Sequence, residues 1–174
     1  ASAQARRDGA ARGLAAGLGA SRRVHGIGLK ARLCVQGCSQ IPGVDYDQTH
    51  CATMRSTSLR IIASIAAARG YHLRRWDFVA AYLQGELLED EVVYSSLPPG
   101  GLGTDEPSDG KMCVVQKPIY GMAQAGRRWQ RSLFPWLLEY GFSQCSADKC
   151  VFTLKRSMET PSGPRDETLI VGVY

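Results

Sequence analysis

The chain has 174 residues, a formal net charge of +5, and 44% hydrophobic and 21% charged residues. This length fits one domain with a real hydrophobic core, and the composition is that of an ordinary globular protein. The apolar run over residues 61–68 is far too short to cross a bilayer, so we expect no membrane partner.

The excess of positive charge belongs to the N-terminal end of the chain. Residues 1–33 contain seven Lys and Arg against a single acid, a local charge of +6, whereas residues 34–174 contain 14 basic and 15 acidic groups. The overall charge is therefore a weak argument for a basic groove in the globular part. Residues 1–28 are rich in Ala, Gly and Arg without apolar periodicity, and we predict a disordered lead-in there, followed by one domain over residues 29–174.

The six cysteines do not have the spacing of a paired zinc motif, although Cys34, Cys38, His50 and Cys51 could be combined into one metal site. We favour reduced, buried thiols over this alternative. The sequence has no apparent secretory signal, so an intracellular, reducing compartment is the default expectation.

The first predicted elements are a strand, a turn and a helix. Apolar and polar residues alternate over residues 29–36, and Pro and Gly within residues 41–47 are typical of a turn. Ser56 or Thr57 can cap a helix that ends at Gly70, and we expect its apolar stripe to pack in the core.

Alternation over residues 71–77 predicts a second strand, which ends at Asp77. A carboxylate at a strand end is held by rigid backbone, and this arrangement suits a metal ligand. The simpler interpretation is that Asp77 caps the turn or short helix predicted over residues 78–83. These residues alone leave both interpretations open.

The second half of the chain predicts short strands and one long helix. The acidic residues within 86–91 are typical of a solvated surface turn. Strands are predicted over residues 92–94, 112–115, 150–154 and 168–174, with a Gly-rich loop over 100–110 and a polar loop before the last strand. The turn over residues 119–126 is predicted to lead into an amphipathic helix that runs to about Tyr140, with a kink or break at Pro135 and an end at Gly141.

An ordered set of short motifs spans the chain from Lys30 to Tyr174. In chain order they are Lys30-Ala31-Arg32-Leu33, Gly37-Cys38-Ser39-Gln40, Pro42-Gly43-Val44-Asp45-Tyr46, Asp77 to Leu83, Gly85-Glu86-Leu87, Pro98-Pro99-Gly100, Tyr120-Gly121-Met122, Gln124-Ala125, Arg127 with Trp129, Tyr140-Gly141-Phe142, and Asp148-x-Cys150-x-Phe152. The set resembles the reverse transcriptase domain of copia-type retrotransposon Pol polyproteins in its order and roughly in its spacing. Any one motif is weak, but the ordered set is specific, and it favours Asp77 as a metal ligand over Asp77 as a helix cap.

The resemblance implies an RNA-directed DNA polymerase that works by two-metal nucleotidyl transfer, with a template–primer and a deoxynucleoside triphosphate as partners. It makes Asp77 the catalytic acid that binds two Mg²⁺ ions, and the carbonyl of Phe78 a further ligand. Lys30 and Arg32 would hold the triphosphate. Tyr82 would lie beneath the incoming sugar, where its bulk would reject a 2′-hydroxyl.

The resemblance also assigns Tyr120, Gly121 and Gln124 to a loop that shapes the nucleotide and template site. The fold that it implies is α+β, an incomplete polymerase palm with partial fingers, in which one antiparallel sheet packs against two helices. Other parts of a Pol polyprotein are further expected partners. The alternative function is a non-catalytic, basic remnant that binds nucleic acid through residues 1–33.

The sequence departs from the family pattern at several positions. The family's other two catalytic acids come as Tyr-x-Asp-Asp, and the sequence given stops at Tyr174, which matches that Tyr. We therefore expect weak Mg²⁺ binding and no polymerase activity from these residues alone. The strand expected before Lys30 is replaced by Ala, Gly and Arg, so we expect the finger hairpin to lack its partner. Gln36, Ala123 and Gly126 stand where the family usually has Lys, Lys and Pro.

Overall fold

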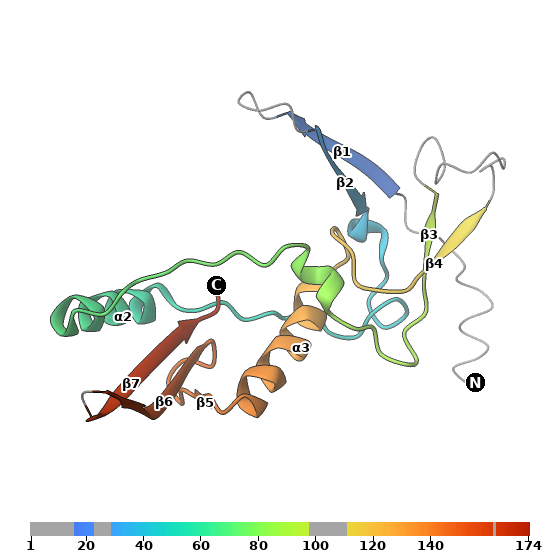
Figure 1. Ribbon diagram of the computed structural model, residues 1–174. Coiled ribbons are helices and arrows are strands. Elements are labelled where there is room, and N and C mark those ends of the chain that lie inside the picture. The colour runs from blue at the N-terminus through green and yellow to red at the C-terminus, as the bar shows by residue number, and fades with distance from the viewer. Residues whose placement is uncertain (1–15, 23–28, 98–110, 162) are drawn as a thin grey trace. The chain divides into compact units, whose positions relative to one another are not determined.

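The computed structural model describes residues 16–22, 29–97, 111–161 and 163–174, with side chains from residue 33 onward except that of Thr160. Helices and antiparallel strands are mixed along this part of the chain, which confirms the predicted α+β class (Figure 1). The chain divides into two compact units. The first contains Ala1–His50 and Ala80–Ser132, and the second contains Cys51–Val79 and Leu133–Tyr174.

The first unit contains a hairpin of β1 (Ala16–Arg22) and β2 (Leu29–Val35). The strands are antiparallel, from Ala16 opposite Val35 to Arg22 opposite Leu29. β2 is the strand predicted over residues 29–36, but its partner strand was not expected. Backbone N–H and C=O groups form the ladder whatever the side chains are, so an Ala- and Gly-rich segment can pair although it lacks apolar alternation.

Residues 16–22 therefore form a strand where we expected a disordered lead-in. Residues 1–15 and 23–28 lie outside the described residues, so the predicted boundary at residue 28 stays a prediction.

A second hairpin of the first unit consists of β3 (Val93–Ser96) and β4 (Met112–Val115), close to the predicted strands. The predicted loop over 100–110 lies outside the described residues. The core of this unit is a cluster of four buried residues, with four partly buried side chains packed against it. The buried members are Val35, Val93, Met122 and Ala125, and the others are Tyr82, Leu87, Val115 and Ile119.

The predicted turn over residues 41–47 is also present. The N–H of Gly43 donates to the carbonyl of Tyr46 at 2.8 Å, and Gly43 has a φ of 76°. This left-handed backbone conformation is the one that favours glycine.

The second unit contains a sheet in the order β5 (Ser143–Gln144), β6 (Val151–Thr160) and β7 (Gly163–Gly172). β6 and β7 form one long hairpin, from Val151 opposite Gly172 to Thr160 opposite Gly163 (Figure 1). The strands are longer than predicted, and they include residues that we assigned to a polar loop. Antiparallel pairing satisfies the backbone there, although the side chains of residues 155–159 are exposed.

The helix α2 (Ser56–Arg69) begins and ends almost where the sequence predicts. Its N-cap residue and the burial of its apolar stripe differ from the prediction. It ends at Gly70, which has a φ of 66°, as expected. Neither Ser56 nor Thr57 is the N-cap, because Arg55 occupies that position without a side-chain cap bond. Of the apolar stripe only Ala66 is buried, and Leu59 is 51% exposed.

The helix α3 (Ala125–Glu139) runs through Pro135 without the break that we considered. It belongs to both units, since Ser132 ends one segment of the first and Leu133 begins a segment of the second. Gly141 follows the helix with a φ of 106°, as predicted. The N–H groups of Gly141 and Phe142 donate to the carbonyls of Leu138 and Leu137, both at 3.0 Å, and these bonds close the last turn.

Two predictions about strands are wrong. Residues 71–77 are not a strand, because they make no ladder with another segment of the described chain, and a strand exists only through its pairing. The described strands also form three small antiparallel sheets instead of one. Among the described residues, no helix is both long enough and apolar enough to cross a membrane.

Candidate nucleotide and metal site

Two tyrosines that the resemblance assigns to the nucleotide site are in contact in the first unit. Tyr82 lies in the short helix η2 (Ala81–Gln84), and Tyr120 lies in the turn before α3. Their ring centroids are 4.8 Å apart with a tilt of 47°. Both rings are half-buried, so each keeps part of its surface accessible while the other restricts its rotation.

The turn of Tyr120 is joined to the end of β2 by direct backbone contact. The N–H of Val35 donates to the carbonyl of Tyr120 at 2.9 Å. Gly121 has a φ of 95°, and a Cβ built on it would overlap the carbonyl of Val35. A Cβ on Gly37 would in turn overlap the carbonyl of Gly121. Both glycines are therefore needed for the close approach of the two backbones.

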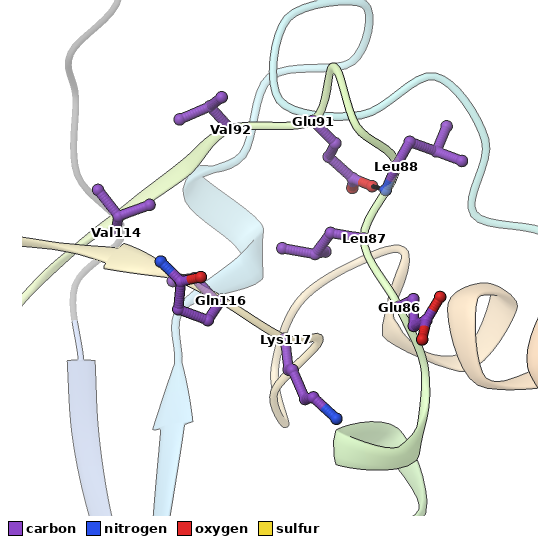
Figure 2. A pocket seen from close by; sticks show the side chains of 9 residues that line it. Glu86, Leu87, Leu88, Glu91, Val92, Val114, Gln116 and Lys117 are labelled. Atoms are coloured by element: carbon purple, nitrogen blue, oxygen red, sulfur yellow. Dashed lines mark hydrogen bonds between the residues drawn. The ribbon is translucent and has the colours of Figure 1, made fainter.

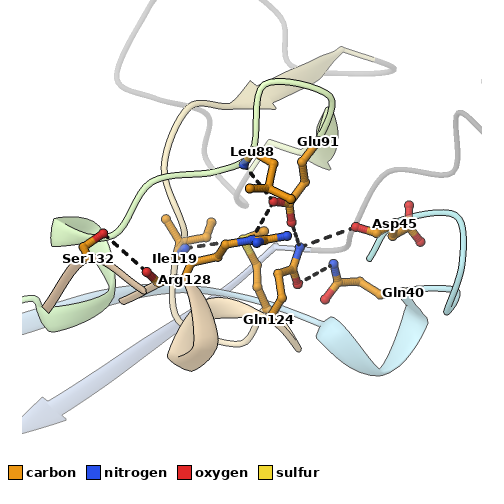
Figure 3. A network of polar contacts seen from close by, with 9 residues as sticks. Gln40, Asp45, Leu88, Glu91, Ile119, Gln124, Arg128 and Ser132 are labelled. Atoms are coloured by element: carbon orange, nitrogen blue, oxygen red, sulfur yellow. Dashed lines mark hydrogen bonds and ion pairs between the residues drawn. The ribbon is translucent and has the colours of Figure 1, made fainter. Parts of the chain in front are cut away.

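Gln124 is fully buried and belongs to a network of polar side chains (Figure 3). Its Nε2 donates to Glu91 Oε1 at 2.7 Å and to the carbonyl of Asp45 at 3.5 Å. Its Oε1 accepts from Gln40 Nε2 at 3.1 Å. The carboxylate of Glu91 also pairs with Arg128, with 2.7 Å between Oε2 and Nε. The side chain of Gln124 is thus fully occupied within the protein.

Three members of this network were not identified from the sequence as functional. Glu91 was placed in a solvated acidic turn, yet its side chain is only 6% exposed. Gln40 and Arg128 are 6% and 5% exposed. Because Glu91 directly follows the three exposed residues 88–90, the sequence pattern gives no signal of its burial. Arg128 stands outside the apolar stripe of the predicted helix, so the sequence gives no hint of its burial either.

Lys30 and Arg32 lie in β2. On β1, Ser21 is opposite Lys30 and Gly19 is opposite Arg32. The two positions are two residues apart in one strand, so they share one face of the hairpin. Their predicted role in holding the triphosphate stays a prediction.

Asp77 and Phe78 lie in the second unit, in the segment that was predicted as a strand end. The side chain of Asp77 is exposed, and Phe78 is 49% exposed. The described residues contain no group of three or more His, Cys, Asp or Glu placed to hold a metal ion. A pair of Mg²⁺ ions needs several oxygen ligands, so the residues described do not by themselves fit a two-metal site.

An open pocket of about 410 Å³ lies beside the network in the first unit (Figure 2). It is lined by residues 86–88 and 91–92 on one side and by residues 114–117 on the other. Glu91 lines the pocket and also belongs to the polar network, so the network borders the pocket at this residue.

In the second unit, a buried carboxylate joins a helix to the sheet. Asp148 is 6% exposed and accepts hydrogen bonds from Ser58 Oγ at 2.5 Å, from the N–H of Arg55 at 2.9 Å and from the N–H of Cys150 at 3.0 Å. These three bonds, with that of Ser58 strongest, hold the pKa of Asp148 below its ordinary value. Asp148 thus supplies the cap of α2 that Ser56 and Thr57 do not.

All six cysteines are reduced, as predicted, but only Cys150 is fully buried. Burial, and then the nearby charge of Asp148, raise the pKa of the Cys150 thiol. This thiol is therefore poorly reactive.

Comparison with known proteins identifies the class of this protein. Residues 21–174 match the family of reverse transcriptases (RNA-dependent DNA polymerases), so the chain belongs to this family. No solved structure matches the chain.

Curated relatives narrow the class to copia-type Pol polyproteins. The chain is 40% identical over 127 residues to the retrovirus-related Pol polyproteins from transposons RE1 and RE2 of Arabidopsis thaliana. It is 31% identical over 125 residues to that from transposon TNT 1-94 of Nicotiana tabacum. These matches cover 71–73% of this chain but only 8–9% of each relative.

Proposed function

We propose that this chain is a part of a copia-type reverse transcriptase that contributes a nucleotide site and one catalytic acid to RNA-directed DNA synthesis. The observation that most directly supports this proposal is the contact between Tyr82 and Tyr120. These residues are far apart in sequence, and the resemblance assigns both to the same site. Their contact beside the end of β2 is what a shared nucleotide site requires.

In this proposal Tyr82 lies beneath the sugar of the incoming nucleotide. Its ring is held by Tyr120 and by the core cluster, so it cannot move aside at low cost when a 2′-hydroxyl approaches. Lys30 and Arg32 would contribute positive charge to the triphosphate. Asp77 alone supplies too few oxygen ligands for a pair of Mg²⁺ ions, so we assign the residues given to nucleotide positioning and not to a complete catalytic centre.

Primer extension on a homopolymer template with Mg²⁺ tests the proposal. The chain as given is compared with a version that continues through the downstream reading frame, and only the longer version is expected to extend the primer. In the longer version Asp77→Asn is expected to abolish extension, whereas Asp166→Asn, an exposed acid on β7, leaves it unchanged. Equal extension by both lengths would contradict the inactivity of these residues, and no extension by the longer version would contradict the polymerase proposal.

Sugar discrimination tests the role of Tyr82 separately. Tyr82→Val in the longer version removes the bulk of the ring, and we expect the ratio of ribonucleotide to deoxyribonucleotide incorporation to rise about tenfold or more, a change of about 1.4 kcal/mol. Tyr82→Phe keeps the ring and is expected to keep the discrimination. An unchanged incorporation ratio in Tyr82→Val would contradict the assignment of Tyr82 to the nucleotide site.

A further inference from the structure

The hydrogen bonds around Gln124 all run from donor to acceptor in one order, which is fixed by the groups at the two ends of the network. At one end the N–H of Ala123 can only donate, and it donates to Gln40 Oε1 at 2.7 Å. At the other end the ionised carboxylate of Glu91 can only accept, and it accepts from Gln124 Nε2 at 2.7 Å. Between them Gln40 Nε2 donates to Gln124 Oε1 at 3.1 Å. Each amide therefore has one orientation that satisfies its neighbours.

We propose that Glu91 is a positioning residue for the nucleotide site, because it orients Gln124 and, through Gln40, holds the turn that carries Tyr120 and Gly121. This inference deepens the proposed function, and it rests on that function only in assigning the turn to a nucleotide site.

The carboxylate of Glu91 is the point where the network is anchored. Its two oxygens accept hydrogen bonds from Gln124 Nε2 at 2.7 Å and from the N–H of Leu88 at 3.1 Å, and Oε2 also forms an ion pair with Arg128, whose Nε lies 2.7 Å away (Figure 3). A neutral amide at this position has a single acceptor oxygen, and its NH₂ group would face another donor. Glu91→Gln has almost the same volume, so it changes the hydrogen bonding with little effect on packing.

The link from this network to the site runs through the backbone of the turn. Ala123, whose N–H is held by Gln40, is two residues from Gly121, and the carbonyl of Tyr120 accepts from Val35 at 2.9 Å. When the orientation of Gln40 is no longer fixed, the N–H of Ala123 loses its acceptor, and the turn is held mainly by its contact with β2. The ring of Tyr120 against Tyr82 is then less restricted.

Amide hydrogen exchange on the 174-residue chain tests the inference without any enzymatic activity. In Glu91→Gln we expect exchange at the N–H groups of Ala123 and Val35 to be about tenfold faster or more than in the unmodified chain. Exchange in the β6–β7 hairpin of the second unit is expected to stay unchanged. Glu89→Gln is the matched control, because it removes the same charge from an exposed position two residues away, and it is expected to change nothing.

A second variant covers the outcome in which Glu91→Gln fails to fold. Gln40→Met cuts the network without touching the ion pair, and it is expected to accelerate exchange at Ala123 in the same way. If both variants fold, the double variant is expected to exchange at Ala123 little faster than either single one, since both break the same series of bonds. Unchanged exchange at Ala123 in Gln40→Met, or additive effects in the double variant, would overturn the inference.

Steady-state kinetics of the longer version distinguish a positioning role from a purely structural one, because they measure KM and kcat separately. Glu91→Gln is expected to raise KM for the deoxynucleotide about tenfold with a smaller change in kcat, whereas Glu89→Gln leaves both unchanged. A fall in kcat at unchanged KM would overturn the positioning role. If the longer version does not polymerise at all, the proposed function fails, and the exchange experiment still decides whether Glu91 holds the turn.

Discussion

The ionised carboxylate of Asp148 stabilises the second unit. Three donors bind its carboxylate, and the pKa of this group is lower in the folded chain than in the unfolded chain. A lowered pKa means that the stabilisation is complete above the ordinary carboxyl pKa of about 4 and is lost as the pH falls through the lower folded value. Asp148 is therefore a source of acid sensitivity.

We expect Asp148→Asn to lower the melting temperature at pH 7 by several degrees, because an amide accepts with one oxygen only and turns its NH₂ group toward donors. The difference from the unmodified chain is expected to shrink as the pH falls well below 4. Thermal unfolding followed by circular dichroism between about pH 2 and pH 7 measures both effects. Asp166→Asn, in an exposed position, is the control, and an equal loss there would refute the specific role of Asp148.

Two glycines with similar backbone conformations allow steric overlap to be separated from backbone strain. Gly121 and Gly43 both have positive φ, of 95° and 76°, but a Cβ on Gly43 would meet nothing within 4 Å. We expect Gly43→Ala to cost about 1 kcal/mol, from backbone conformation alone. Gly121→Ala is expected to cost about 2 kcal/mol more, since the carbonyl of Val35 has to move. Urea unfolding measures both costs, and equal values would mean that the backbone approach yields easily.

At the scale of elements, the β6–β7 hairpin has a buried end and an exposed end. Phe152 near the beginning of β6 is fully buried, and its ring centroid lies 4.9 Å from that of Phe134 on α3. Further along the hairpin, Arg156 pairs with Glu167 at 3.3 Å, with both side chains about half exposed. The stability of the hairpin should therefore come from its inner end.

We expect Phe152→Ala to lower the free energy of unfolding by about 3–5 kcal/mol, because it leaves a cavity in the core. Glu167→Gln removes only an exposed ion pair and is expected to change it by less than about 0.5 kcal/mol. Chemical denaturation of the two variants makes the comparison. Similar losses would show that the outer half of the hairpin contributes more than its exposure indicates.

Elements whose signals are local could be predicted from the sequence. The glycines after α2 and α3 mark both helix ends, because a left-handed residue there needs no tertiary partner. The segment 71–77 has the alternation of a strand, but strand formation depends on a partner that a local pattern cannot provide. In the same way β1 has no pattern of its own, and its pairing with β2 brings it into the fold.

For a related reason, the sequence pointed to some residues of the candidate site and not to others. Motif resemblance assigned Tyr82, Tyr120 and Gly121 to one site, and the structure brings these residues together around the end of β2 without testing their roles. It could not identify Glu91, because the burial of an acid depends on Arg128, a distant residue, and local composition indicates a surface turn. The roles of all the predicted site residues remain predictions: Lys30, Arg32, Asp77, Phe78, Tyr82, Tyr120, Gly121 and Gln124.

At the scale of the whole molecule, the charge is divided unequally along the chain. Residues 1–33 carry a local charge of +6, while the remainder is close to neutral. This division separates the polymerase proposal from the alternative of a basic nucleic-acid-binding remnant. In the alternative, phosphate contacts from the N-terminal end provide nearly all the affinity, and affinity then falls steeply with salt.

Replacing Arg6, Arg7, Arg12, Arg22 and Arg23 by Gln tests this alternative in the chain as given. The alternative expects salt-dependent binding to a single-stranded oligonucleotide to be lost, with a much smaller slope of log affinity against log salt. The polymerase proposal expects the longer version with the same replacements to keep primer extension at low salt. Fluorescence anisotropy titrations at several salt concentrations measure the slope.

The exposed segment over residues 72–77 has a practical consequence for handling the protein. The segment belongs to none of the described strands, and Leu73 and Trp76 are 66% and 75% exposed, as is Val79 just after it at 87%. Large apolar side chains that are exposed close together favour aggregation between molecules. Preparations of these 174 residues should therefore become turbid as they are concentrated, and a charged replacement such as Trp76→Lys should keep them clear.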